Sequence, residues 1–140
     1  MNRIKPVRLV VIDYLGYING GTKNEGRTER ISRIAREVKE LAKRLRCVVL
    51  LISQTSRSAG GGSEEVSLTD ARDSGVIEDT ADFLVGCWRP ELRKGISFEE
   101  FAETQGLLWF RILKARRGMQ DKFAVFFEGA TISVLDLPEK

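Results

Sequence analysis

Two polar side chains stand directly after long apolar runs. Asp13 follows the run Leu9–Ile12, and Gln54 follows the run Val48–Ile52 after a single serine. Buried parallel strands read as continuous apolar blocks, and side chains that handle ligands lie at their carboxyl ends. A carboxylate there can hold magnesium, directly or through water, and an amide can bind phosphate without adding charge. The pair is typical of the sheet of a nucleoside triphosphatase, although an Asp after a strand also commonly caps a turn.

A second group, Arg72-Asp73-Ser74-Gly75, stands at the start of an expected short helix. The Arg72 guanidinium can bind a phosphate in a two-pronged fashion. Backbone N–H groups around Gly75 would face outward at the helix start, where an anion is favoured. These residues therefore predict a phosphate contact. The alternative is a surface helix that Asp73 or Ser74 caps.

A third group, Lys114-Ala115-Arg116-Arg117, lies at the tip of an expected hairpin whose turn covers 116–121. Alternate residues of an extended segment face one way, so Lys114 and Arg116 would project together. Two cations on a rigid tip suit an anion outside the chain. We interpret them as a finger for the nucleotide site of a neighbouring subunit. The alternative is a solvated basic turn.

The elements that would position these groups follow from the apolar pattern. Steps of three and four from Ile31 to Leu45 predict an amphipathic helix over 28–46, whose basic face we interpret as solvated. Strands over 7–14 and 48–53 flank it, which makes a parallel strand–helix–strand unit. The other expected elements are a mobile glycine-rich loop over 56–67, a helix over 73–80, a strand over 83–88, a polar insertion over 90–105 with a helical turn at 98–102, and β segments over 107–113, 123–127 and 131–135. The class is α/β, parallel first and antiparallel last, in one domain over 1–140.

Composition excludes several kinds of protein. The 140 residues carry a net charge of +3 and no histidine, which removes histidine-based catalysis and histidine metal sites. A pI near 9.0 is compatible with nucleic acid without being diagnostic of it. No apolar run reaches the roughly 18–20 residues of a membrane helix, and no signal peptide follows Met1. We expect a cytoplasmic protein without a membrane partner.

In chain order, five short stretches resemble the later part of the C-terminal RecA-like ATPase domain of bacterial DnaB-like replicative DNA helicases. They are Val11–Leu15; Ile31–Arg33 with Lys39, Leu41, Ala42 and Lys43; Ile52–Arg57; Arg72–Gly75 with Ile77, Glu78, Ala81 and Asp82; and Lys114, Arg116 and Gly118. Each stretch is short, but their common order makes the resemblance specific. It covers most of the chain except 89–106 and the C-terminal end.

The resemblance implies a nucleotide site that is shared between subunits. Asp13 would be the Walker B acid that organises magnesium, and Gln54 would sense the γ-phosphate of ATP. Arg116 would be an arginine finger, with Lys114 as its companion, acting on the ATP of a neighbouring subunit. The implied cofactors are ATP and Mg²⁺.

The resemblance also implies contacts with single-stranded DNA inside a hexameric ring. Arg57, Arg72, Asp73 and Gly75 would contact the strand. The implied activity is 5′→3′ translocation with duplex unwinding, and the implied partners are single-stranded DNA, further copies of the chain, and a loader or primase. The implied fold is part of a RecA-like P-loop NTPase domain.

One departure from the family concerns the phosphate loop. No G-x-x-x-x-G-K-[ST] occurs in the 140 residues, and the family's catalytic glutamate also belongs before the matched stretches. We therefore expect the distal portion of an ATPase domain that lacks Walker A and does not hydrolyse ATP alone. The absent strand would lie within the sheet and leave two strand edges open. Such edges favour association, strand exchange or closure of the gap.

Two other functions fit the same residues. Another RecA-like ATPase would share the strand ends, but Arg72–Gly75 and Lys114 with Arg116 favour the helicase. A non-catalytic module could bind single-stranded nucleic acid or modulate a helicase ring. Salt-dependent binding of single strands without nucleotide would favour that module.

Overall fold

The computed structural model describes residues 6–19, 25–55, 60–70 and 74–137. The chain divides into two compact units. The first comprises Met1–Gln54 and Ala71–Ala81, and the second comprises Thr55–Asp70 and Asp82–Lys140. No helix in the described ranges is both long and apolar enough to cross a membrane.

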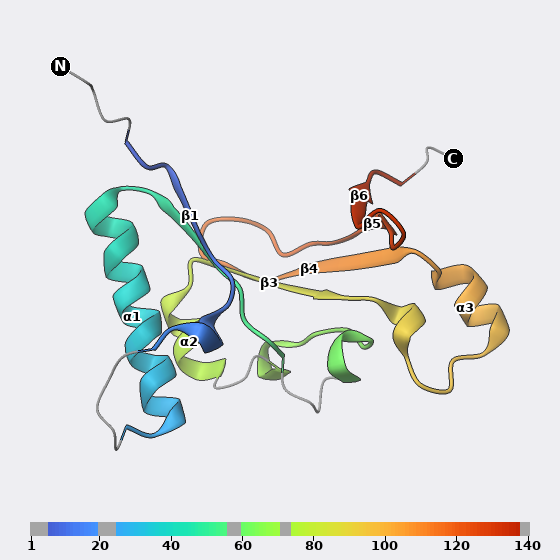
Figure 1. The fold of residues 1–140 in the computed structure, drawn as a ribbon, viewed down its shortest axis with the longest axis horizontal. Coiled ribbons are helices and arrows are strands. Elements are labelled where there is room, and N and C mark those ends of the chain that lie inside the picture. Colours follow the sequence, from blue (N-terminus) through green and yellow to red (C-terminus); the bar gives the residue numbers. More distant parts are fainter. Residues whose placement is uncertain (1–5, 20–24, 56–59, 71–73, 138–140) are drawn as a thin grey trace. The chain divides into compact units, whose positions relative to one another are not determined.

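The described residues of the first unit form two parallel strands, two α-helices and a 3-10 turn at Leu15–Tyr17 (Figure 1). β1 (Leu9–Ile12) and β2 (Val48–Leu51) are joined through α1 (Arg27–Leu45), and α2 (Ser74–Thr80) packs against α1. Leu9 pairs with Val48 and Ile12 with Leu51, so both strands end at the same edge of the sheet. The predicted parallel strand–helix–strand unit is therefore confirmed, with strands shorter than expected.

The apolar face of α1 forms the core of this unit. Ile31, Ile34 and Ala35 are buried, and Ile34 is only 1% exposed. The helix ends at Arg46, whose φ of 51° lies in the left-handed region. There the Cys47 N–H donates to the Ala42 carbonyl at 3.1 Å, which caps the last turn.

The two parallel strands bury only one face, which differs from the expectation. Leu9, Val11, Val48 and Leu50 are exposed, whereas the residues between them are half-buried. Continuous apolar runs predict strands that are covered on both faces. Within the first unit α1 covers one face of the pair, and the residues of the other face are apolar.

The second unit is a four-stranded antiparallel sheet whose strands follow in chain order. The strands are β3 (Phe83–Trp88), β4 (Leu107–Ala115), β5 (Lys122–Glu128) and β6 (Ser133–Leu135). β3 has the predicted bounds, and the β4–β5 hairpin with its turn at 116–121 is confirmed. β4 and β5 extend beyond the predicted segments, while β6 is shorter.

The segment before β3 packs on this sheet. It contains 3-10 turns at Gly60–Gly62 and Leu68–Asp70. Val66 is buried against Trp88 and Leu113. A Cβ on Gly86 would lie 2.8 Å from the Val66 Cβ, so only glycine allows this approach. Where the expected mobile loop falls within the described residues, Ser63 and Val66 are buried, so this part of the loop is anchored on the sheet.

Lys122 of β5 binds the segment that precedes β3 through Glu65. Its Nζ lies 5.2 and 4.9 Å from the ring centroids of Trp88 and Trp109 and 2.7 Å from Glu65 Oε2. Arg111 pairs with the other Glu65 oxygen at 2.5 Å. The hydrogen bond from Lys122 is the main reason that the pKa of Glu65 lies below its usual value.

A helical excursion links β3 to β4. It contains a 3-10 turn at Pro90–Leu92 and α3 (Phe98–Thr104), which extends the predicted turn at 98–102. Ser97 and Glu100 form a reciprocal capping box at the start of α3. This spacing is a known helix-start signal that would have predicted the full helix.

Candidate functional site

The parallel pairing of β1 and β2 brings Asp13 and Gln54 to one edge. Asp13 is the first residue after β1, and Gln54 lies three residues beyond β2. The Ile52 N–H donates to the Ile12 carbonyl at 3.0 Å, and the Leu15 N–H donates to the Ile52 carbonyl at 2.8 Å. Asp13 and Gln54 are both exposed at this edge. The arrangement suits a ligand that approaches the strand ends.

A small cavity of about 50 Å³ opens beside Gln54. Its walls come from the segment after β1, the first turn of α1 and the end of β2. The residues that line it are Tyr14, Leu15, Gly16, Arg27, Arg30, Ile31, Ser53 and Gln54. A Cβ on Gly16 would lie 2.4 Å from Cε2 of Tyr14, so this glycine makes room for the ring that forms one wall.

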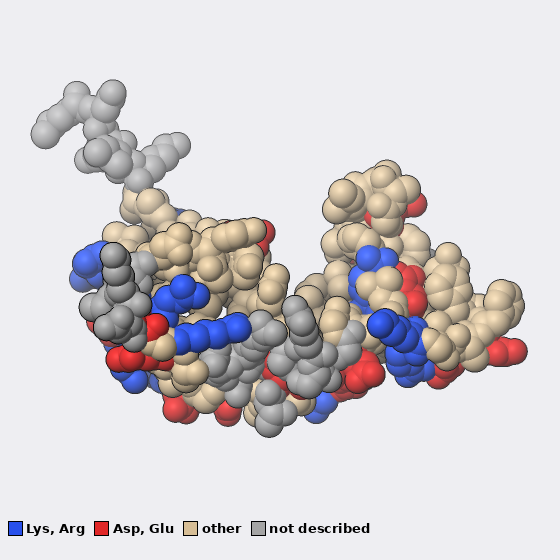
Figure 2. Space-filling model, turned by 60° about the horizontal axis from the view of Figure 1, so that its bottom comes forward, with Lys and Arg blue, Asp and Glu red and all other residues tan. Residues whose placement is uncertain are grey.

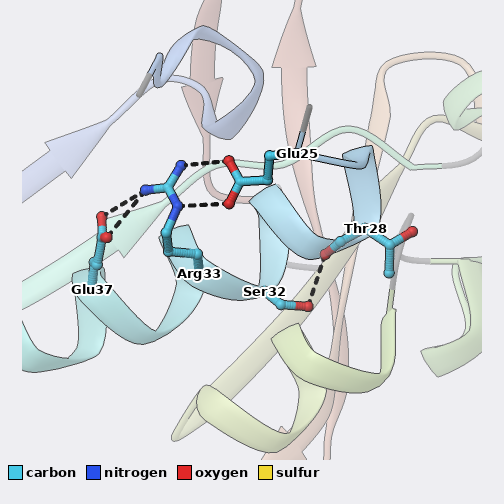
Figure 3. Close-up of polar contacts among 5 residues, drawn as sticks. All are labelled: Glu25, Thr28, Ser32, Arg33 and Glu37. Carbon is cyan, nitrogen blue, oxygen red and sulfur yellow. Dashed lines mark hydrogen bonds and ion pairs between the residues drawn. The ribbon is translucent and has the colours of Figure 1, made fainter. Parts of the chain in front are cut away.

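Ion pairs fix the start of α1 near these strand ends (Figure 3). Arg33 Nε and Nη2 donate to the two Glu25 oxygens at 2.8 and 3.0 Å, and Arg33 Nη1 donates to Glu37 at 3.1 Å. The hydrogen bond from Arg33 lowers the pKa of Glu25, and the hydrogen bond to Glu25 in turn raises the pKa of Arg33. Ser32 Oγ donates to the Thr28 carbonyl on the same turn at 2.8 Å.

The oxygen donors at this edge suit magnesium only as a partial ligand set. Among the described residues, no three acidic, histidine or cysteine side chains come together as a metal site. A lone carboxylate such as Asp13 is compatible with Mg²⁺, which keeps several waters and commonly takes one or two carboxylates together with substrate phosphates.

Lys114 and Arg116 lie in the second unit, and only one of them is at a turn. Lys114 is within β4 and pairs with Leu84 of β3. It lies beyond the last pair between β4 and β5, Arg111 with Lys122, because β4 remains bound to β3 there. Arg116 is the first residue beyond β4. It is exposed, and its Nε lies 3.8 Å from Asp82 Oδ1.

Of the predicted DNA-contacting residues, Gly75 alone can be placed. It is exposed in the first turn of α2, and a Cβ there would meet nothing within 4 Å. Arg57, Arg72 and Asp73 lie outside the described residues.

The sequence reasoning missed Tyr14, Arg27 and Arg30, which line the cavity with Gln54. From the sequence, the basic face of α1 reads as a solvated surface. A signal was present, because Arg27 and Arg30 are three residues apart in the first turn and share one side of the helix.

Comparison with known proteins gives a consistent result. Residues 1–135 match the family described as DnaB-like helicase C terminal domain. The replicative DNA helicase DnaB of Mycobacterium intracellulare is 35% identical over 113 residues, which is 80% of this chain and 19% of that protein. The chain therefore spans about a fifth of that relative.

Solved structures agree in fold. One solved ATPase domain aligns with a TM-score of 0.83 and 28% identity over 97% of this chain and 47% of its own. A DnaB-like replicative helicase, solved in a study of its interactions with primase, aligns with the same TM-score and identity over 32% of its chain. These ATPase domains are RecA-like, which confirms the predicted fold class. The chain belongs to the DnaB-like helicase C-terminal domain family.

Proposed function

We propose that this chain supplies the Walker B acid, the nucleotide sensor and the trans-acting finger of an ATP-driven replicative DNA helicase. The observation that carries the proposal is the parallel β1–β2 pair, which delivers Asp13 and Gln54 to one edge in a member of this family. We propose it as the distal part of one ATPase domain, acting in the cytoplasm.

Each residue has a distinct task in the proposal. Asp13 would hold the water shell of Mg²⁺, which offsets the phosphate charge during hydrolysis. Gln54 would hydrogen-bond the terminal phosphate or the attacking water without adding charge. Arg116 is exposed directly after β4, so its guanidinium can reach an anion outside its own unit. Lys114 would support that contact.

Single-stranded DNA is the proposed substrate, with Arg57, Arg72, Asp73 and Gly75 as contacts. A ring of copies is the proposed assembly, because a finger that acts in trans requires a neighbour. A primase is a proposed partner, since a structurally similar replicative helicase was solved in a study of its interactions with primase.

The test fuses a glycine-rich phosphate-loop half of a DnaB-like ATPase domain ahead of residue 1 and measures phosphate release with single-stranded DNA. We expect turnover that Asp13→Asn abolishes and that Arg116→Ala lowers by about 10³-fold. The exposed Arg44→Gln variant is the charge-matched control.

Mixing the two inactive variants tests the trans arrangement. In a ring with equal shares, about one interface in four combines an intact Asp13 with an intact Arg116, so activity should return. Turnover that survives Asp13→Asn would refute the proposed site. Absence of recovery on mixing would refute the trans role of Arg116.

A further inference from the structure

The cavity beside Gln54 is basic. Arg27 and Arg30 contribute to its wall, and no acidic side chain is among the described residues that line it. The Nε of Arg30 is buried and has no hydrogen-bond partner in the described part of the chain. A buried donor on a charged group is costly when it lacks an acceptor. Arg27 and Arg30 thus make the wall of the cavity basic, which favours an anionic ligand.

The nearby carboxylate of Glu25 is already bound to another residue. Glu25 lies close enough for Arg30 to lower its pKa, but both Glu25 oxygens accept hydrogen bonds from Arg33. Arg27 and Arg30 also lie in the first turn of a 19-residue helix. The helix dipole disfavours cations there and favours an anion. An anion in the cavity would offset both effects.

The size of the cavity limits what can enter. A buried water needs roughly 10–15 Å³ of such volume, so about 50 Å³ holds roughly three to five waters. That space suits the oxygens of one phosphate group and is too small for a nucleobase. The ligand is thus a phosphate that the rest of a larger molecule presents at the mouth.

An aromatic surface lies next to this cavity. The Tyr14 ring, which forms one wall, meets the Tyr17 ring edge to face with centroids 4.5 Å apart. Tyr17 is 74% exposed, which leaves its ring accessible. Cations that follow a backbone, combined with an aromatic side chain for a base, are the usual components of a single-strand binding site.

The net charge of the chain, +3, is small for 140 residues. Figure 2 shows positive and negative side chains interspersed on one face, with broad uncharged areas between them.

We propose that the cavity holds a backbone phosphate of single-stranded DNA and that a neighbouring base stacks on Tyr17. This inference rests on the proposed function and extends it, because the DNA phosphate would then share a cavity wall with Gln54, the proposed sensor of the ATP γ-phosphate. Gln54 would then respond both to the position of the strand and to the state of the nucleotide.

The first experiment measures binding of a labelled oligodeoxythymidine to the 140-residue chain by fluorescence anisotropy at several salt concentrations. We expect Arg30→Gln to weaken binding by about 10- to 100-fold, as for loss of one charged hydrogen bond. The salt slope should fall by about 0.7, as for loss of one phosphate contact on a single strand. Arg44→Gln removes the same charge at the far end of α1 and should change the affinity by less than about twofold because salt screens it.

The aromatic part has its own variants. Tyr17→Leu should weaken binding by roughly 5- to 100-fold, and Tyr17→Phe should restore it, since the phenyl ring still stacks. A strand that carries 5-iodouracil should photo-crosslink to Tyr17 in the unaltered chain, which makes the test independent of how the variants fold. Loss of binding that is equal in Arg30→Gln and Arg44→Gln, or crosslinks confined to other residues, would overturn the inference.

Two further arms separate the sources of phosphate and the two proposals. Excess inorganic phosphate or ATP should compete only weakly with the strand, and competition at equal concentration would assign the cavity to nucleotide instead. Binding that Arg72→Gln weakens and Arg30→Gln leaves intact would refute this inference while the proposed function stands. Binding lost in Arg30→Gln, with phosphate release of the fused protein indifferent to Asp13→Asn, would refute the proposed function alone.

Discussion

Gly86 provides the sharpest test of how the second unit is packed. Its hypothetical Cβ would lie 2.8 Å from Val66 Cβ, 3.0 Å from Val66 Cγ1 and 3.2 Å from Leu113 Cδ1. Overpacking of this kind costs about 1–3 kcal/mol, and replacing a strand glycine by alanine returns about 0.5–1 kcal/mol. Because the nearest atom is a rigid β-branched carbon, we take the upper end and expect Gly86→Ala to lower the free energy of unfolding by about 2 kcal/mol.

A double mutant shows whether that cost comes from Val66. Val66→Ala removes two methyl groups from a side chain that is 3% exposed, at about 0.8 kcal/mol each plus a cavity contribution, so about 2 kcal/mol in total. The methyl group added at position 86 would fill part of that cavity. The double variant should therefore lose about 2–3 kcal/mol, less than the sum of the single losses.

The assay is urea unfolding followed by tryptophan fluorescence. Trp88 and Trp109 are the two tryptophans of the chain and both lie in the second unit, so the signal reports this unit. Gly118→Ala is the control, because its Cβ would meet nothing closer than 3.5 Å. Two results would show that positions 66 and 86 are not in contact. One is a Gly86→Ala variant with unchanged free energy of unfolding. The other is a double variant whose loss equals the sum of the two single losses to within about 0.5 kcal/mol.

Three further predictions concern the helices and their charges. Ser97→Ala breaks the capping box of α3 and should lower the unfolding free energy of the second unit by about 1 kcal/mol, with Ser97→Asp retaining most of it in the same fluorescence assay. Arg33 lowers the pKa of Glu25, so the Glu25 carboxylate stabilises the fold fully above its unfolded pKa of 4.5. That stabilisation is lost as the pH falls through the lower folded pKa. Melting followed by circular dichroism between pH 7 and 3 should therefore show a smaller fall in melting temperature for Glu25→Gln than for the unaltered chain. Arg46→Gly relieves a left-handed residue at the end of α1 and should raise stability by about 0.5 kcal/mol, whereas an unchanged melting temperature would indicate that Arg46 is not strained.

The elements were largely predictable because their apolar patterns are local. The helix steps from Ile31 to Leu45 and the run Phe83–Trp88 each fixed an element to within a few residues. The sequence was a poorer guide to which faces of the strands are covered. Apolar residues on both faces of β1 and β2 indicate that each face is to be covered. They do not show which segment covers each face.

The candidate site was predictable to the same degree. Asp13 and Gln54 could be paired from sequence because a strand–helix–strand unit places both strand ends at one edge. The cavity could not be foreseen, since it depends on how the chain returns from Tyr14 to Arg27 and on the Tyr14 ring lying against Gly16. The pairing of Lys114 with β3 was not predicted, because strand alternation does not show how far a hairpin strand stays paired on its other side.

The apolar face of β1 and β2 that the first unit leaves uncovered bears on how the chain behaves in a cell. In the described residues β2 pairs with β1 alone, Val48 is 66% exposed, and Val48–Ile52 contains no charge, proline or glycine. Such a segment, whose second backbone edge pairs with no described strand, can stack with identical copies into cross-β fibrils. We therefore expect the protein quality-control system to limit how much of the chain exists with β2 uncovered. Chaperones and proteases that recognise exposed apolar strands would compete with fibril growth for every such copy.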